Sequence, residues 1–211
     1  MTKPRLRIGL IGTGFMGKAH VFGFTSAPRV FDLPYELELR TVADITPQAA
    51  DEAARRLGFA RGTARWQDLV EDPDIDVISV TAPNALHKEM SLAAIRAGKH
   101  VYCEKPLAPL AQDAREMSDA AEAAGVRTQV GFNYLCNPML GLAREMIAAG
   151  ELGRSEAIAV SIAKTTWPMH RAHSPSATIP RAAGRWPISA ATRWRPLNIC
   201  AARLPASWAT A

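Results

Sequence analysis

The chain has 211 residues, and 48% of them are hydrophobic, which is enough to bury the core of at least one domain. The formal net charge of +5 comes from residues 165–211, which contain six Arg and no Lys, Asp or Glu, whereas residues 1–164 carry 19 basic and 20 acidic side chains. No apolar run approaches the roughly 18 residues of a membrane span. The three cysteines (Cys103, Cys136 and Cys200) are too far apart to indicate a disulfide framework or a metal site. We therefore expect a cytoplasmic protein with no membrane segment, signal peptide or metal.

The first predicted element is a strand that ends in a glycine-rich turn. Residues 7–17 read RIGLIGTGFMG, with Gly12, Gly14 and Gly17 in the spacing G-x-G-x-x-G. The first glycine allows a tight turn, the second lets the backbone approach a pyrophosphate, and the third lets the next helix pack on the strand. The sequence therefore predicts a dinucleotide site at the start of this helix, with a plain glycine-rich turn as the alternative. We expect the helix to end at Ser26, because Ala27-Pro28 follows.

A second strand is predicted over residues 35–44, and Asp44 stands at its end. An acidic residue at this place accepts hydrogen bonds from the ribose hydroxyls of a dinucleotide. It also disfavours a 2′-phosphate, so NAD is expected rather than NADP. The alternative is a solvated Asp that begins a turn. Thr46 and Pro47 then predict the start of a helix, and Gly58 its end.

A third strand is predicted over residues 76–80, and the turn Thr81-Ala82-Pro83-Asn84 follows it. Folds of this type bind their ligand at such a turn, beyond the carboxyl end of a strand. Thr81 is therefore a candidate cofactor contact. Asn84 is expected to cap the helix that follows, which Gly98 closes.

The stretch KHVYCEKP contains a short strand, His100–Cys103, with Glu104 and Lys105 at its carboxyl end. On an open surface this would be a solvated acid–base pair. In a cleft beside a nicotinamide, the Lys would hold a substrate hydroxyl and assist its proton loss, with Glu104 adjusting its charge.

The remaining elements complete an alternating pattern. We expect a helix over residues 110–124, a last parallel strand over residues 127–131, a helix over residues 137–149 and an alternating strand within residues 153–163. This order predicts an α/β fold with a parallel sheet.

The motifs GTGFMG, VAD, TAPN with His87, and GKHVYCEKPLA resemble, in this order over residues 6–163, the Gfo/Idh/MocA family of NAD(P)-dependent oxidoreductases. The resemblance implies an N-terminal Rossmann domain with a doubly wound parallel sheet. A second, mostly antiparallel α+β domain would bind a sugar or polyol and take part in homo-oligomer contacts. In this chain only the first strand of that domain is expected, followed by an irregular tail.

The resemblance also implies roles for individual residues. Lys105 would be the catalytic lysine near the nicotinamide and the substrate. Asn133 and Tyr134 would contact the substrate, although Leu135 stands where the family frequently has Arg. His87 would contact a ligand from the first turn of its helix, or would be a plain surface residue. The candidate cofactor contacts are Gly12, Gly14, Phe15, Met16, Gly17, Asp44, Thr81, Pro83, Asn84, His87, Glu104 and Lys105.

The last part of the chain departs from every regular pattern. We expect the Rossmann domain over residues 1–135, a linking helix and strand over residues 136–164, and an irregular tail over residues 165–211. The tail holds four of the five Trp and six of the fifteen Pro, a composition unlike that of ordinary disordered tails. As an alternative, its Arg and Trp would form a nucleic-acid arm, but the tail lacks Lys, and we expect no nucleic-acid partner.

A change of reading frame explains the tail better. When the codons for residues 179–192 are read one base earlier, the degenerate code permits the peptide DPAGGGALADLGSH. This peptide resembles the family segment G-G-x-x-x-D-x-G-S-H, whose Asp and His contact the substrate in many members. We therefore predict that the chain is out of frame from some point between residues 165 and 178.

These observations predict an oxidoreductase that transfers a hydride between a nicotinamide cofactor and a sugar or an inositol-like polyol. The substrate motif is absent from the sequence as printed, so we expect impaired turnover in this chain. The alternative is a non-catalytic NAD-binding module or an inactive fragment.

Overall fold

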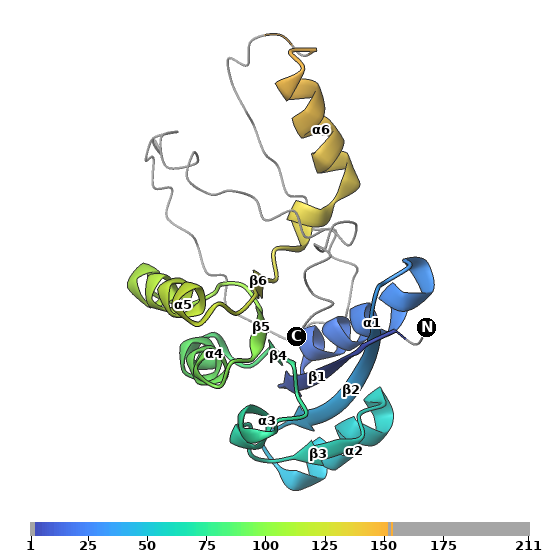
Figure 1. Cartoon of the computed structure of the whole chain (residues 1–211), viewed down its shortest axis with the longest axis vertical. Coiled ribbons are helices and arrows are strands. Elements are labelled where there is room, and N and C mark those ends of the chain that lie inside the picture. The colour runs from blue at the N-terminus through green and yellow to red at the C-terminus, as the bar shows by residue number, and fades with distance from the viewer. Residues whose placement is uncertain (1–2, 152, 154–211) are drawn as a thin grey trace, which may run out of the picture. The chain divides into compact units, whose positions relative to one another are not determined.

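The computed structural model describes residues 3–151 and residue 153. Among them, the residues up to Asn137 form one compact unit, and helix α6 (Pro138–Ala148) belongs to a second unit (Figure 1). The strand predicted within residues 153–163 and the irregular tail predicted from residue 165 lie outside the described residues. The predicted domain boundaries therefore stay a prediction.

The first unit is built on one sheet of parallel strands, which confirms the predicted Rossmann-type α/β fold. The strand order is β3-β2-β1-β4-β5-β6. The strands are β1 (Arg5–Ile11), β2 (Glu36–Ala43), β3 (Arg61–Thr63), β4 (Val77–Val80), β5 (His100–Cys103) and β6 (Thr128–Val130).

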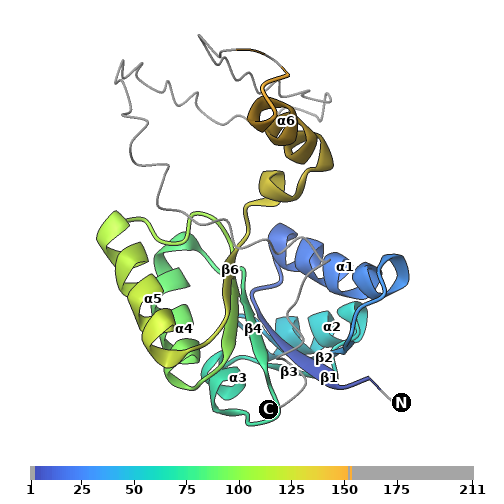
Figure 2. The ribbon, with the colours of Figure 1, turned by 45° about the horizontal axis from the view of Figure 1, so that its top comes forward.

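Helices cover both faces of this sheet, with α1 and α2 on one side and α4 and α5 on the other (Figure 2). The helices of the first unit are α1 (Phe15–Val30), α2 (Pro47–Leu57), α3 (Gln67–Glu71), α4 (His87–Arg96) and α5 (Ala111–Ala124), with the 3₁₀ turns η1 (Asn84–Leu86) and η2 (Asn133–Cys136). None of the helices within residues 3–151 is long and apolar enough to cross a membrane.

The core follows from the alternation of side chains along the strands. Leu10 and Val42 are fully buried in a cluster with residues of α1 and α2. Ile78 and Val80 belong to the cluster on the opposite face, with residues of α4 and α5. Because successive side chains of a strand point to opposite faces, Ser79 lies on the α1 side of the sheet.

Helix α1 does not end at Ser26 as predicted but continues through Pro28 to Val30. A proline inside a helix removes one backbone hydrogen bond and crowds the preceding turn. Here the proline lies in the last turn, and the following backbone bond, from the N–H of Phe31 to the carbonyl of Ala27 at 2.8 Å, is still formed. The loss at Pro28 is therefore local, and the helix ends just after it.

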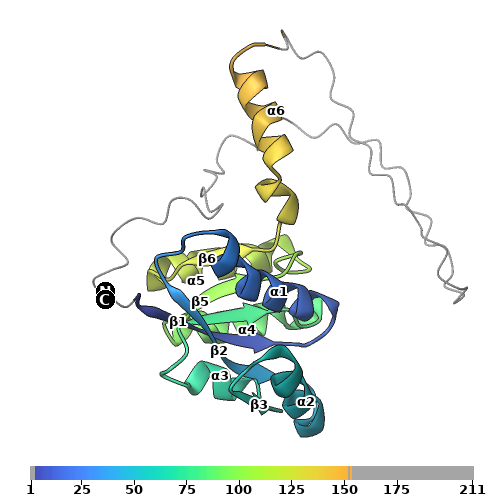
Figure 3. The ribbon, with the colours of Figure 1, turned by 90° about the vertical axis from the view of Figure 1, so that its right-hand side faces the viewer.

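Helix α2 has the predicted ends. The hydroxyl of Thr46 accepts a hydrogen bond from the N–H of Ala49, Pro47 occupies the first helical position, and Gly58 closes the helix with φ = +84°. The short edge strand β3 beside this helix (Figure 3) was not predicted. A Cβ on its central residue, Gly62, would overlap the backbone of Ala50 in α2, so the absence of a side chain lets the helix pack closely.

The predicted cap of α4 is wrong. Asn84 begins the 3₁₀ turn η1, and α4 starts at His87 without a hydrogen bond from a capping side chain. The N–H of Leu86 bonds to the carbonyl of Pro83 at 2.8 Å, so the tight turn takes the place of a side-chain cap.

Candidate functional site

The carboxyl ends of five neighbouring strands form one row. Ile11 is in register with Ala43 of β2 and Val80 of β4, while Val80 pairs with Cys103 of β5 and Cys103 with Val130 of β6. The residues that follow these positions therefore lie side by side at one edge of the sheet: Gly12, Asp44, Thr81, Glu104 and Gly131. The sheet thus brings together candidates that are up to about ninety positions apart in the sequence.

Each of the three glycines in the loop has a different steric environment. Gly12 has φ = +92°, and a Cβ there would lie 2.9 Å from the carbonyl oxygen of Thr81. A Cβ on Gly17 would overlap the carbonyl oxygen of Gly12. A Cβ on Gly14, by contrast, would meet no atom of the described residues within 4 Å. The fold therefore requires Gly12 and Gly17, whereas the open space at Gly14 leaves room for a ligand.

Helix α1 begins at this open space without the usual stabilisation of a helix start. Gly14 is its N-cap residue, no side chain caps the first turn, and no acidic residue lies in that turn. The free N–H groups and the positive end of the helix dipole are consequently available to an anion. Phe15 is 84% exposed, and Met16 is half-buried beside it. The donors and the space fit the pyrophosphate of a dinucleotide.

Asp44 is held next to the glycine loop. One carboxylate oxygen accepts a hydrogen bond from the hydroxyl of Thr13, and the other accepts one from the N–H of Ile45 at 2.7 Å. Thr13 was not among the predicted site residues, because it stands at a variable position of the glycine motif. Each carboxylate oxygen keeps a further lone pair, so Asp44 still has acceptors for two hydroxyl groups.

A groove of about 180 Å³ adjoins Thr13 between the start of α1 and α2. Its lining includes Lys18 from α1 and Glu52 and Arg56 from α2. Both charge signs are present, since Glu52 lies 3.9 Å from Arg56. The groove extends the glycine loop on the side where Asp44 is bound to Thr13.

Two of the predicted cofactor contacts use their side chains inside the protein. The hydroxyl of Thr81 donates toward the carbonyl oxygens of Ile11, at 3.0 Å, and Gly12, at 2.8 Å. His87 is fully buried, and its ring nitrogens lie 2.8 Å from the carbonyl oxygen of Ala82 and 2.9 Å from that of Pro106. These side chains tie neighbouring turns together, and the structure gives His87 no open face toward a ligand. The alternative of a plain surface histidine is wrong, because the ring is fully buried.

Other candidates stand at the rim and are exposed. Pro83 and Asn84 begin η1 after β4. Asn133 and Tyr134 lie in η2 after β6, and Tyr134 is 60% exposed. Their side chains are thus accessible beyond the carboxyl ends of β4 and β6.

Glu104 and Lys105 point in different directions. Glu104 is only 5% exposed, whereas Lys105 is exposed. One carboxylate oxygen of Glu104 lies 3.1 Å from Nε2 of His20, and the other accepts the backbone N–H of Lys105 at 3.1 Å. Within residues 3–151, the ammonium group of Lys105 has no hydrogen bond or ion pair. The two side chains therefore do not form the solvated pair given as the alternative, and Lys105 is exposed.

His20 was not among the candidates, yet it lies at the centre of a buried polar cluster. Its Nδ1 is 2.8 Å from the hydroxyl of Ser79, and its ring stacks on Tyr102 with the centroids 4.3 Å apart. The spacing carried a signal: His20 follows Gly17 by three positions and therefore shares the buried side of α1 with it. Burial lowers the pKa of His20, although the hydrogen bond and the charge of Glu104 act in the opposite direction.

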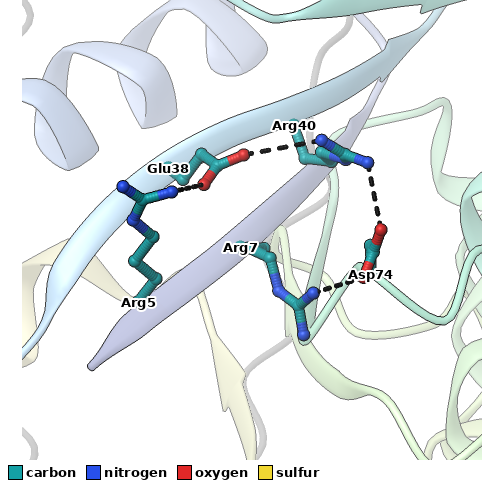
Figure 4. Close-up of a pocket in the computed structure, with 5 residues that line it drawn as sticks. All are labelled: Arg5, Arg7, Glu38, Arg40 and Asp74. Carbon is teal, nitrogen blue, oxygen red and sulfur yellow. Dashed lines mark hydrogen bonds and ion pairs between the residues drawn. The ribbon is translucent and has the colours of Figure 1, made fainter.

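A cavity of about 310 Å³ lies at the start of β1 and β2, away from the row just described (Figure 4). Arg7 lies 2.6 Å from Asp74 and 3.1 Å from Asp76, and Arg40 also reaches Asp74 at 3.1 Å. The hydrogen bond with Asp76 raises the pKa of Arg7, against the effect of burial. Because these charges are paired with one another, the cavity is an ion-pair network rather than a second candidate site.

Comparison with known proteins points to the same family as the sequence motifs. Residues 6–132 match the model of the Gfo/Idh/MocA oxidoreductase family with the NAD-binding Rossmann fold. A levoglucosan dehydrogenase of Pseudarthrobacter phenanthrenivorans is 43% identical over 150 residues, which are 71% of this chain and 38% of that protein. An inositol 2-dehydrogenase/D-chiro-inositol 3-dehydrogenase of Lactiplantibacillus plantarum is 33% identical over 70% of this chain and 41% of its own length.

A solved structure of levoglucosan dehydrogenase, in complex with NADH and levoglucosan, resembles the chain with a TM-score of 0.69 and 42% identity. The similarity covers 71% of this chain and 41% of that one. The present chain therefore spans about two fifths of the length of the relatives that it matches.

Proposed function

This chain belongs to the Gfo/Idh/MocA family of oxidoreductases, and on that basis we propose that it binds NAD and transfers a hydride between the nicotinamide and a sugar or polyol. Both relatives named above are dehydrogenases of such compounds. As in the family, the protein would be a cytoplasmic homo-oligomer.

The observation that carries the proposal is the combination of open space and free donors at Gly14. The helix start offers N–H groups that no side chain caps, and the residue that a pyrophosphate must approach has no Cβ. Asp44 lies in the same row and keeps free acceptor positions. The pyrophosphate would bind over Gly14 and the first turn of α1, and the adenosine ribose at Asp44.

Asp44 also favours NAD over NADP. A 2′-phosphate would stand against a carboxylate whose two oxygens already face Thr13 and the Ile45 N–H. Lys18 and Arg56 line the neighbouring groove, but neither forms a hydrogen bond or ion pair with Asp44 among the described residues. Within residues 3–151, the negative charge of Asp44 is therefore not neutralised by an ion pair.

Lys105 is proposed as the catalytic residue. Its side chain extends from the carboxyl end of β5 into solvent, while the backbone below it is fixed by Glu104. From this position Nζ would hold the reacting oxygen of the substrate: as the neutral amine it would take up the hydroxyl proton during oxidation, and as the resulting ammonium group it would return that proton during reduction. Bound NAD supplies the carbon that accepts or returns the hydride. Asn133 and Tyr134, exposed at η2, are the proposed substrate contacts on this part of the chain.

Calorimetric titration of the 211-residue chain with NAD⁺ and NADP⁺ tests the cofactor assignment. We expect NAD⁺ to bind more tightly, and Asp44→Asn to weaken NAD⁺ binding about tenfold or more, the effect of a hydrogen bond to a charged group. The same substitution should reduce the preference for NAD⁺ over NADP⁺. Glu52→Gln, which removes a carboxylate from the neighbouring groove, is the matched control and should leave the preference unchanged. Equal binding of both cofactors by the unaltered chain would contradict the role of Asp44.

A second candidate is an NAD-binding module without turnover. It is favoured by residues 165–211, where the substrate motif of the family is absent from the sequence as printed. Incubation with NAD⁺ and either levoglucosan or inositol, followed at the absorbance of NADH, separates the two. Cofactor binding without NADH formation supports the module, and ordinary turnover excludes it.

A further inference from the structure

The buried polar cluster beneath Lys105 is built from residues of β4, β5, helix α1 and the turn that follows β5. Ser79 of β4 and Tyr102 of β5 are paired in the register of the sheet, and Glu104 follows two positions later on the same side. Helix α1 places the ring of His20 against them, stacked on Tyr102 at an interplanar angle of 8°. His20, Ser79 and Glu104 are each at most 6% exposed.

The hydrogen bonds of this cluster form a continuous chain. With a neutral imidazole, the Ser79 hydroxyl donates to Nδ1 of His20, and the Nε2–H group donates to Glu104. The second oxygen of Glu104 accepts the N–H of Lys105. In this arrangement the Ser79 hydroxyl, both ring nitrogens of His20 and both carboxylate oxygens of Glu104 are hydrogen-bonded, and the lowered pKa of His20 favours the neutral ring that it needs.

The surroundings are shaped around the carboxylate. A Cβ on Gly131, after the end of β6, would overlap Oε1 of Glu104, so a side chain there would displace this carboxylate from its present position. A buried carboxylate is costly unless it is fully hydrogen-bonded. A cluster with a packing role alone would be served by apolar residues, whereas this one directs one carboxylate oxygen to α1 and the other to the backbone of Lys105.

We propose that His20 is a positioning residue, which orients Glu104 and thereby links the cofactor-binding helix α1 to the turn that carries Lys105. This inference rests on the proposed function for the role of α1 and Lys105. The helix that meets the pyrophosphate at its first turn holds, one turn later, the group that fixes the Lys105 backbone. Cofactor binding and the placement of Lys105 are therefore energetically linked.

The chain of hydrogen bonds from Ser79 through His20 and Glu104 to the Lys105 N–H is called the relay below. Hydrogen exchange of the Lys105 amide, measured by NMR on the full chain without cofactor, tests this relay. His20→Phe keeps the ring stacking but removes both polar bonds, and we expect exchange about tenfold faster, the factor for one lost hydrogen bond. His20→Gln retains one donor and one acceptor and should restore most of the protection. Phe24→Leu is the matched control, since Phe24 packs edge-on against His20 and Tyr102 without a polar atom.

The proposal is overturned if the Lys105 amide exchanges in His20→Phe at the rate of the original chain. It is also overturned if this amide exchanges as fast in Phe24→Leu or in His20→Gln as in His20→Phe. If His20→Phe unfolds, Ser79→Ala replaces it as the test variant, because it removes only the Ser79 hydroxyl from the chain of hydrogen bonds. We expect a smaller acceleration of Lys105 amide exchange in Ser79→Ala. An unchanged exchange rate in this variant would again overturn the proposal.

The link to the cofactor is tested by NAD⁺ titration of the same variants. We expect about tenfold weaker binding in His20→Phe and near-normal binding in His20→Gln. If the unaltered chain fails to bind NAD⁺, the proposed function fails, while the exchange rates still decide the relay. If exchange responds and affinity does not, the linkage to cofactor binding is refuted.

Discussion

Gly14→Ser separates the fold of the glycine loop from its proposed use. Gly14 has φ = −62° and ψ = −165°, which any residue adopts, and a Cβ there meets no atom within 4 Å in the part of the chain that the structure describes. Serine is a better helix N-cap than glycine by a few tenths of a kcal/mol. We therefore expect the free energy of unfolding to stay within about 0.5 kcal/mol of the original value, or to rise slightly.

The same substitution should impair cofactor binding. The new Cβ fills the space that a pyrophosphate needs, and the serine hydroxyl occupies one of the free N–H groups of the first turn. Losing one hydrogen bond to a charged group costs about 1.5–3 kcal/mol, which corresponds to a roughly 10- to 100-fold weaker affinity.

Urea unfolding and NAD⁺ calorimetry on the same sample measure the two effects. Gly23→Ala is the matched control, because Gly23 lies in the same helix and its Cβ would also meet nothing within 4 Å. This control should gain about 0.5–1 kcal/mol of stability without any change in affinity. A Gly14→Ser protein that binds NAD⁺ as tightly as the original chain would refute the assignment of the pyrophosphate site.

Three further outcomes follow from the described contacts. Gly17→Ala places a Cβ against the backbone of the glycine loop, so we expect a loss of about 2–4 kcal/mol in urea unfolding. Burial lowers the pKa values of His20 and His100 in the folded state, so below about pH 6.5 the unfolded chain binds more protons than the folded chain. The free energy of unfolding, measured in urea, should therefore fall as the pH is lowered from 7 toward 5. His20→Gln should make this fall shallower. Burial raises the pKa of Cys103 to about 11, so at pH 8 iodoacetamide should modify the exposed Cys136 and spare Cys103, which peptide mass spectrometry checks.

The parts of the fold that sequence reasoning predicted correctly are those with local causes. Thr46 as a cap and Gly58 at a left-handed helix end act within a few residues, and both were confirmed. The strand of residues 36–43 also followed from its own pattern. Where the outcome depended on distant groups, prediction failed: the polar strand of residues 61–63 forms only because β2 offers an edge to pair with.

The candidate site shows the same division. Parallel strands place their carboxyl ends in one row, so the convergence of Asp44 and Glu104 could be foreseen. The directions of the side chains could not be foreseen, because they depend on partners far along the chain. Glu104 turns inward to His20, which is 84 positions away, and Asp44 is bound by Thr13, which is 31 positions away. His87 looked like a rim residue only because its two carbonyl partners were unknown.

The close approach of Gly131 to Glu104 has a consequence for redesign of the site. The two positions occupy one shared volume, because the carboxylate fills the space into which a side chain on residue 131 would project. A larger residue at 131 would therefore have to displace the Glu104 carboxylate, which in the present structure contacts both His20 and the Lys105 amide. Saturation libraries aimed at this end of β6 should vary the two positions together, so that the residue at 104 can accommodate each replacement at 131.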